Sequence, residues 1–235
     1  MARLPRLTLP GEPHLVVQRA LPQRAAFADD IDRRAYAHVL REALSAEQVA
    51  LHAYALCADE VRLVLTPAAP GSLPRLMQHL GRRFVAHHHR RHGGSGPLWD
   101  GRYRCVPLDS AACLDALRWV DGAAAEGFSS ESRHCGAATA RLDDLPLREP
   151  PVYWDLGNTP FEREAAYRRL LAEGPPAPRV AQLLAALKGG WAFGAPGFLA
   201  RAAQSGGRPA SPRPRGRPAR SAGTVTAASR SGGGA

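Results

Sequence analysis

Lysine is almost absent from this chain of 235 residues, because Lys188 is the only lysine among 31 basic residues and all the others are arginine. The net charge is nevertheless +10, and the isoelectric point is near 10.4. Arginine binds phosphate oxygens with a planar, two-pronged guanidinium, which the ammonium group of lysine does not offer. The composition therefore favours a polyanionic partner such as nucleic acid, although a merely soluble basic surface gives the same charge balance.

Signs of disulfides, membrane spans and secretion are also missing. The four cysteines show neither C-x-x-C spacing nor the density of a disulfide framework: Cys57, Cys105, Cys113 and Cys135. We therefore expect reduced thiols and a cytoplasmic protein. No apolar run approaches the ~20 residues of a membrane span, and the N-terminal residues lack the apolar core of a signal peptide. These absences predict that the chain has no membrane partner.

The C-terminal segment 205–235 contains no acidic residue but has six arginines, seven glycines and four prolines. Such a composition buries no apolar surface, so we predict a disordered basic tail. Within it, Arg215 and Arg217 flank Gly216 in the string Pro-Arg-Gly-Arg-Pro. This string resembles an AT-hook, which inserts arginines into a narrow A·T minor groove. Low-complexity arginine-proline segments also produce such strings by chance.

Hydrophobic periodicity in residues 1–130 predicts the order strand, helix, strand, strand, helix, strand, helix. The predicted strands lie at 14–19, 49–56, 61–66 and 103–108, and the last predicted helix ends near Asp121. The first predicted helix is capped by Asp29 or Asp30, and its apolar face consists of Ile31, Ala35, Val39, Leu40 and Leu44. The second is capped by Ser72, and its apolar stripe consists of Leu73, Leu76, Met77, Leu80 and Phe84. This order predicts an α+β fold with a ferredoxin-like split βαβ sheet. Residues 131–204 form a predicted helical extension, with helices around 160–172 and 180–187.

Several segments, taken in order and spacing, are similar to a known family. The segments are Leu51-His52-Ala53-Tyr54, Leu63-Val64-Leu65-Thr66-Pro67, Gly96-Pro97-Leu98-Trp99-Asp100-Gly101-Arg102-Tyr103-Arg104, Tyr153-Trp154-Asp155-Leu156-Gly157-Asn158-Thr159-Pro160 and Gly189-Gly190-Trp191. Together they resemble the single-tyrosine HUH transposases, in particular the REP-associated tyrosine transposases of bacteria. The resemblance covers roughly residues 4–200 and implies an HUH-type domain at 1–130.

The resemblance implies that a tyrosine nucleophile cuts and transfers single-stranded DNA, while two histidines of an H-x-H motif hold a divalent ion such as Mg²⁺ or Mn²⁺. Alternate residues of a strand face one side, so both imidazoles of such a motif reach one ion. In this chain Glu60 and Arg62 occupy the histidine positions, and Trp119 occupies the tyrosine position. Arginine offers only hydrogen-bond donors and indole has no acidic hydroxyl. A loop after Asp121 is shortened as well. We therefore predict a degenerate copy that has lost its catalytic site, its metal cofactor and its activity.

Two interpretations of these replaced positions stay open. Glu60 and Arg62 either pair with each other on one strand face or present a guanidinium to phosphate where the ion stood. Trp119 either fills the volume of the tyrosine or stacks on an unpaired base.

A metal site elsewhere is not predicted. His88 and His92 stand one helical turn apart in the run His87–His92, but a zinc site needs a third ligand, and no cysteine lies nearby in sequence. We interpret this run as a polar helix end.

The candidate DNA-binding side chains are Arg82, Arg83, Arg102, Arg104, Arg215 and Arg217. Arg102 and Arg104 alternate with Tyr103 along a strand, so both point to one face, where they suit a nucleic-acid backbone. The leading hypothesis is a catalytically inactive DNA-binding protein for single-stranded or hairpin DNA. One alternative is an active transposase or endonuclease with a substitute nucleophile such as Tyr103, and another is a decayed copy that folds poorly.

Overall fold

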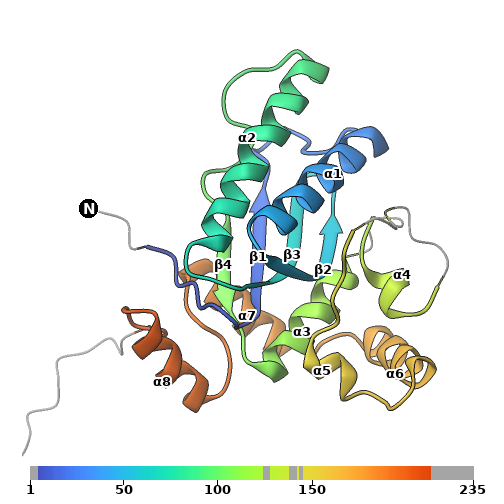
Figure 1. Ribbon diagram of the computed structural model, residues 1–235, viewed down its shortest axis with the longest axis vertical. Coiled ribbons are helices and arrows are strands. Elements are labelled where there is room, and N and C mark those ends of the chain that lie inside the picture. The colour runs from blue at the N-terminus through green and yellow to red at the C-terminus, as the bar shows by residue number, and fades with distance from the viewer. Residues whose placement is uncertain (1–4, 124–127, 138–141, 143–144, 213–235) are drawn as a thin grey trace, which may run out of the picture.

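The computed structural model describes residues 5–123, 128–137, 142 and 145–212. A four-stranded antiparallel sheet lies at its centre (Figure 1). The strands are β1 (His14–Arg19), β2 (Val49–Leu56), β3 (Glu60–Pro67) and β4 (Arg104–Pro107), in the order β2-β3-β1-β4. Helix α1 (Asp30–Ala46) joins β1 to β2, and α2 (Ser72–His92) joins β3 to β4. This is a ferredoxin-like split βαβ arrangement, and it confirms the α+β fold predicted from the sequence.

The sheet has a hydrophobic core on each face, because strand side chains alternate between the two sides. On β3, Val61, Leu63 and Leu65 pack with α1 and α2 on the side nearer the viewer in Figure 1. Val64 packs on the opposite side with α3 (Ser110–Asp121). Asp109 caps α3 by accepting a hydrogen bond from the backbone of Ala112 at 2.8 Å. The apolar stripe predicted for α2 is buried in full.

The buried face of α1 differs from the predicted one. Asp29 caps the helix as expected, but Ile31 is 56% exposed, whereas Asp32 and Tyr36 are fully buried. The prediction for Ile31 was wrong because Asp32 turns inward, where its carboxylate accepts a hydrogen bond from the backbone N–H of Ala28 at 2.9 Å.

Helix α2 begins without the predicted cap. Gly71 occupies the cap position with φ of 82°, and Ser72 is the first helical residue and makes no side-chain capping bond. The positive φ suits glycine, so the turn chemistry rather than a serine hydroxyl sets the start of this helix.

Most of the extension packs on the α3 side of the sheet and shares its core, while its last helix packs with Leu7 and Leu9 of the N-terminal segment. It contains α4 (Glu131–His134), α5 (Pro151–Trp154), α6 (Pro160–Glu173), α7 (Ala177–Gly189) and α8 (Pro196–Ser205). Tyr153, Tyr167 and Leu183 lie in one buried cluster with Leu117 and Val120 of α3. The helices predicted around 160–172 and 180–187 correspond to α6 and α7, while α8 was not expected. The extension and the sheet therefore form one hydrophobic unit.

Residues 206–212, which the sequence assigns to the tail, lie against the body. Arg208 donates a hydrogen bond to the carbonyl of Gly190 at 2.7 Å, and Ala210 is buried in a small cluster with Leu7 and Phe198. The AT-hook-like residues Arg215 and Arg217 lie outside the described residues. No helix in the described part of the chain is long and apolar enough to cross a membrane.

Candidate nucleic-acid interface

The three positions that the sequence links to catalysis come together on the α3 side of the sheet. Glu60 and Arg62 are alternate residues of β3, and Nε of Arg62 donates to Oε1 of Glu60 at 2.5 Å. The Arg62 guanidinium carbon lies 3.8 Å from the centre of the Trp119 ring, and its Nη1 donates to the Trp119 carbonyl at 3.3 Å. Residues far apart in sequence thus meet in one cluster, hereafter the Glu60–Arg62–Trp119 cluster.

The Glu60 carboxylate at the centre of this cluster accepts hydrogen bonds from two arginines. Glu60 is 4% exposed, and it also accepts a hydrogen bond from Arg19, its register partner on β1. That hydrogen bond is the main reason why the pKa of Arg19 is raised. Glu60 and Arg62 therefore pair with each other, which is one of the two arrangements that the sequence leaves open.

A cleft opens beside the cluster, between the β4 edge of the sheet, α3 and α7. Its volume is about 360 Å³, and its lining consists of Val17, Arg19, Asp100, Arg102, Arg104, Trp119, Leu184, Leu187 and Lys188. A second hollow of about 540 Å³ shares Asp100, Arg102, Arg104, Leu187 and Lys188 with it, and is also lined by Arg6, Tyr103, Trp191 and Arg208. Together these two hollows are called the basic cleft below. Six basic side chains and one carboxylate line it, so its potential favours anions.

Arginines stack on the aromatic rings of the basic cleft. The Arg6 guanidinium lies 3.7 Å from the centre of the Tyr103 ring, and that of Arg208 lies 5.4 Å from the centre of the Trp191 ring. Flat cations and rings of this kind are the groups that proteins use to hold single-stranded nucleic acid, because each can stack on a base.

Arg102 and Arg104 both line the basic cleft, and Nη1 of Arg104 donates to the carbonyl of Lys188 at 3.4 Å. Arg102 lies in the bend before β4 rather than on the strand that the sequence predicts, so strand alternation does not set its direction. Arg82 and Arg83 lie instead on the exposed side of α2, where Arg83 pairs with Glu42 of α1 at 2.6 Å. The structure thus separates the two pairs of arginines.

Sequence reasoning missed four basic residues of the cleft: Arg6, Arg19, Lys188 and Arg208. They come from separate segments, so no local pattern joins them. The one signal was the family-like Gly189-Gly190-Trp191, which follows Lys188 directly.

Tyr103 is the substitute nucleophile that the sequence suggests. Its hydroxyl oxygen is buried and has no hydrogen-bond partner among the described residues. Burial raises the pKa of Tyr103 to about 12. A phenol that stays protonated and has no adjacent base is a weak nucleophile.

Two solved structures resemble the chain in outline. The structure of a REP-associated tyrosine transposase bound to a REP hairpin gives a TM-score of 0.49 at 9% identity, over 64% of this chain and 99% of that one. A candidate transposase from Deinococcus radiodurans R1 gives 0.35 at 20% identity, over 52% of this chain and 96% of that one. No family model and no curated protein matches the chain. The fold assignment therefore rests on the strand order itself.

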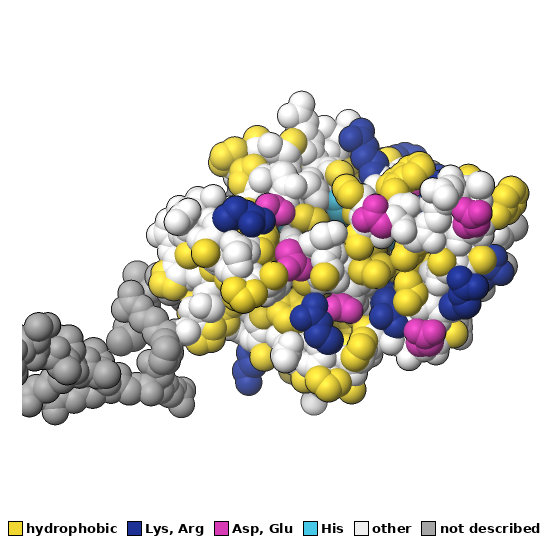
Figure 2. Space-filling view, turned by 90° about the horizontal axis from the view of Figure 1, so that it is seen from below, with side chains coloured by type: hydrophobic (Ala, Val, Ile, Leu, Met, Phe, Trp, Pro, Cys, Tyr) yellow, Lys and Arg dark blue, Asp and Glu magenta, His cyan; other side chains and the backbone are white. Residues whose placement is uncertain are grey.

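The end of the molecule at the bottom of Figure 1 has a mixed charge pattern. Figure 2 shows this face, on which basic side chains lie scattered among acidic and apolar ones. The basic side chains that line the cleft are gathered around two adjoining hollows.

Proposed function

We propose that the chain is a DNA-binding protein of the single-strand DNA transposase type, and that it holds single-stranded or hairpin DNA in the basic cleft without cutting it. The observation that carries the proposal is the Glu60–Arg62–Trp119 cluster. Its residues lie where the family resemblance requires two metal ligands and a nucleophile to meet, and the cluster adjoins the basic cleft through Trp119 and Arg19.

The basic cleft suits a single strand better than a duplex. A single strand exposes phosphates and base faces to the same groove, so arginines and aromatic rings act on it together. In a duplex the bases are already stacked, and mainly the phosphates remain for the cleft to bind. A hairpin with unpaired flanks offers both kinds of strand, and we take it as the ligand.

The residues present do not fit the divalent ion that the resemblance implies. Both oxygens of Glu60 accept hydrogen bonds from guanidinium groups, and Arg62 has no lone pair to donate. A divalent ion at Glu60 would also lie beside two fixed positive charges, which repel it. Trp119 adds no hydroxyl for attack on phosphorus. These groups support retention of DNA without cleavage.

Paired substitutions test the binding site. Arg102→Gln with Arg104→Gln removes two charges from the basic cleft, and Arg168→Gln with Arg169→Gln removes two exposed charges from α6 as a matched control. Fluorescence anisotropy of a labelled hairpin with single-stranded flanks is recorded over a range of salt concentrations. The cleft variant should bind more weakly, and the slope of log K against log salt should fall by about 1.4, at about 0.7 for each lost contact to a single strand. Equal losses of DNA affinity in the two variants would show that the basic cleft is not the binding site.

A second experiment tests the absence of cleavage. The native chain is incubated with the same hairpin and Mg²⁺ or Mn²⁺, and we expect no covalent protein–DNA adduct. The triple variant Glu60→His, Arg62→His and Trp119→Tyr restores the named groups but not the shortened loop after Asp121, which overlaps residues outside the described part of the chain. Because a nucleophile misplaced by ~1 Å already costs about 10²-fold, this variant should be weakly active at most. An adduct of the native chain at Tyr103 would favour the active-enzyme alternative.

A further inference from the structure

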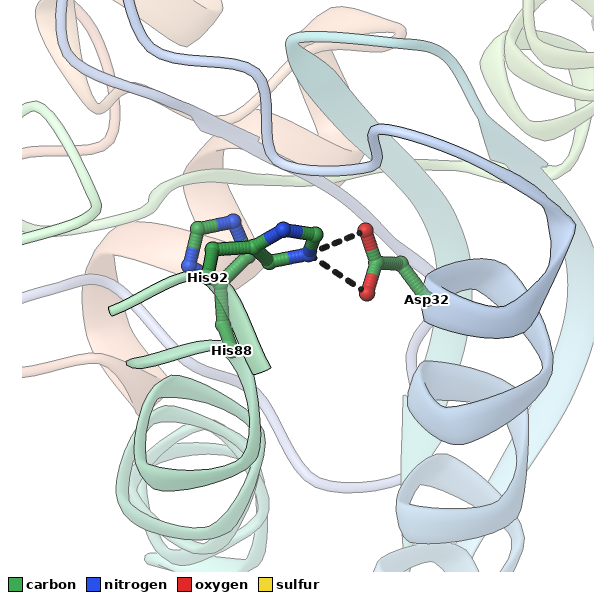
Figure 3. Close-up of side chains that lie close together, drawn as sticks. All are labelled: Asp32, His88 and His92. Carbon is green, nitrogen blue, oxygen red and sulfur yellow. Dashed lines mark hydrogen bonds and ion pairs between the residues drawn. The ribbon is translucent and has the colours of Figure 1, made fainter. Parts of the chain in front are cut away.

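Helix α2 ends in a histidine-rich run, and α1 supplies a partner for it that the sequence does not indicate. Figure 3 shows Asp32 of α1 facing His88 and His92 of α2. One ligand atom from each of the three residues lies within 4.8 Å of the other two. The run alone offers two imidazoles, but the fold adds a carboxylate and completes a set of three.

His88 is already oriented as a metal ligand. Its Nε2 lies 3.2 Å from the carbonyl oxygen of Ala25, which can only accept, so Nε2 carries the proton. The proton on Nε2 leaves a lone pair on Nδ1. That atom is buried and has no hydrogen-bond partner among the described residues. Ligating histidines in metalloproteins have this arrangement, in which one ring nitrogen donates to a carbonyl and the other faces the ion.

Asp32 and His92 provide the other two groups. Asp32 is fully buried, and its carboxylate is held by the backbone N–H of Ala28 at 2.9 Å and by Nη1 of Arg91 at 2.6 Å. Nε2 of His92 lies 2.9 Å from Oδ2 and 3.0 Å from Oδ1 of Asp32. Arg91 also pairs with Asp29 at 2.8 Å, so its charge is shared between two carboxylates and the group retains one negative charge.

We propose that Asp32, His88 and His92 bind one Zn²⁺ ion. Two imidazole nitrogens and one carboxylate oxygen are ligands that zinc accepts, with water in the fourth position. His92 is exposed, so the open position faces solvent. Tetrahedral ligands about 2.0–2.1 Å from zinc lie roughly 3.4 Å apart, so the side chains must draw together by at most about 1.5 Å.

The ion ties the first turn of α1 to the last turn of α2. The chain leaves α2 at Gly93 and continues through the loop to Asp100 and Arg102, which line the basic cleft. Zinc at this point therefore joins α1 to the helix end from which that loop departs, on the opposite face of the sheet from the Glu60–Arg62–Trp119 cluster.

The test uses the full chain without a polyhistidine tag, and zinc chloride as the only probe. Metal content after dialysis against zinc and then metal-free buffer should give one equivalent per chain. Because zinc binds the folded chain, the melting temperature should rise by about 5–10 °C at free zinc about 100 times its dissociation constant. Cobalt substituted for zinc should give the visible absorption of a tetrahedral site.

His88→Gln and His92→Gln should each weaken zinc binding by at least about 100-fold, since loss of a ligand exceeds the 10–100-fold effect of an outer contact. The matched controls are His87→Gln, which removes a neighbouring histidine of the same run, and His38→Gln, which removes an exposed histidine of α1. Both should bind as the native chain does. Asp32→Asn should also lose the ion, but Asp32 is buried and holds the start of α1, so this substitution also affects the fold. The two histidine variants are therefore the decisive test of zinc binding.

Absence of zinc from the native chain would overturn the proposal, and so would equal binding by the native chain and the two ligand variants. Both outcomes are independent of DNA binding, which the cleft variants measure separately.

Discussion

Asp121, the last residue of α3, holds the extension to the sheet, and its removal should destabilise the whole fold. The side chain is fully buried and accepts three hydrogen bonds. Its partners are the Ser130 hydroxyl at 2.5 Å, Nδ1 of His134 at 2.7 Å and the Tyr167 hydroxyl at 2.6 Å. Burial, followed by the charge of Asp121, raises the pKa of Tyr167 well above its usual value, so the phenol remains a donor.

The substitution Asp121→Ala leaves three buried donors without an acceptor. Removing a buried carboxylate from the groups that donate to it costs about 3–5 kcal/mol, because the donors keep their desolvation penalty. For a chain of this size, about 2–4 °C is lost per kcal/mol, so the melting temperature should fall by about 6–20 °C. Asp121→Asn keeps an amide oxygen as acceptor but loses the charge, and it should cost about 1.5–3 kcal/mol.

The assay is urea-induced unfolding followed by tryptophan fluorescence, with Asp115→Ala as the matched control. Asp115 lies on the same helix and pairs with Arg179 at 2.8 Å, but the Arg179 side chain is 37% exposed. A pair with one solvated partner is worth at most about 1 kcal/mol. If Asp121→Ala cost no more than Asp115→Ala, Asp121 would not be the link that joins the extension to the sheet.

Three further predictions follow from other features. Burial lowers the pKa of His14 to about 4, so the folded state favours the neutral ring. The neutral ring therefore contributes at most about 3 kcal/mol to the free energy of unfolding. This contribution is complete above pH ~6.5 and is lost as the pH falls through about 4. The stability difference between the native chain and His14→Gln in urea titrations should therefore shrink on acidification, and parallel pH curves would contradict this. Leu183→Ala should lower the free energy of unfolding by about 2–5 kcal/mol in the same titrations, because Leu183 is fully buried in the shared core. A loss as small as that of a surface substitution would show that α7 is not part of this core. Deletion of residues 213–235 removes five arginines and spares the packed residues 206–212. The slope of log K against log salt for DNA binding should then fall by at most about 3.5–4.5, and an unchanged slope would show that the tail does not bind DNA.

The order of the secondary structure elements in the sheet domain was predictable because their signals are local. The stripe from Leu73 to Phe84 repeats at helical spacing, and β1 and β2 have the bounds that their apolar runs predict. The inward turn of Asp32 was not predictable, since a carboxylate looks like a surface residue until Arg91 and His92 are placed beside it.

The candidate site was predictable only in part. The sequence singles out Glu60, Arg62 and Trp119 only through the family resemblance, and the stacking of Arg62 on Trp119 depends on how α3 crosses the sheet. The basic cleft draws side chains from the N-terminal segment, β1, β4, α3, α7 and the segment after α8, and their grouping depends on tertiary structure.

The shared core has a consequence for the nascent chain on the ribosome. All four strands have been synthesised once Pro107 is added and α3 follows directly, but α3 is not covered until Tyr153, Tyr167 and Leu183 follow. At 5–20 residues per second, the stretch from Asp121 to Leu187 takes about 3–13 s to make. During that interval the apolar side chains of α3 that later pack with the extension, such as Leu117 and Val120, are open to other nascent chains. The core on this side of the sheet is therefore complete only after the extension has been synthesised, and exposed apolar surface of this kind is what chaperones protect in nascent chains.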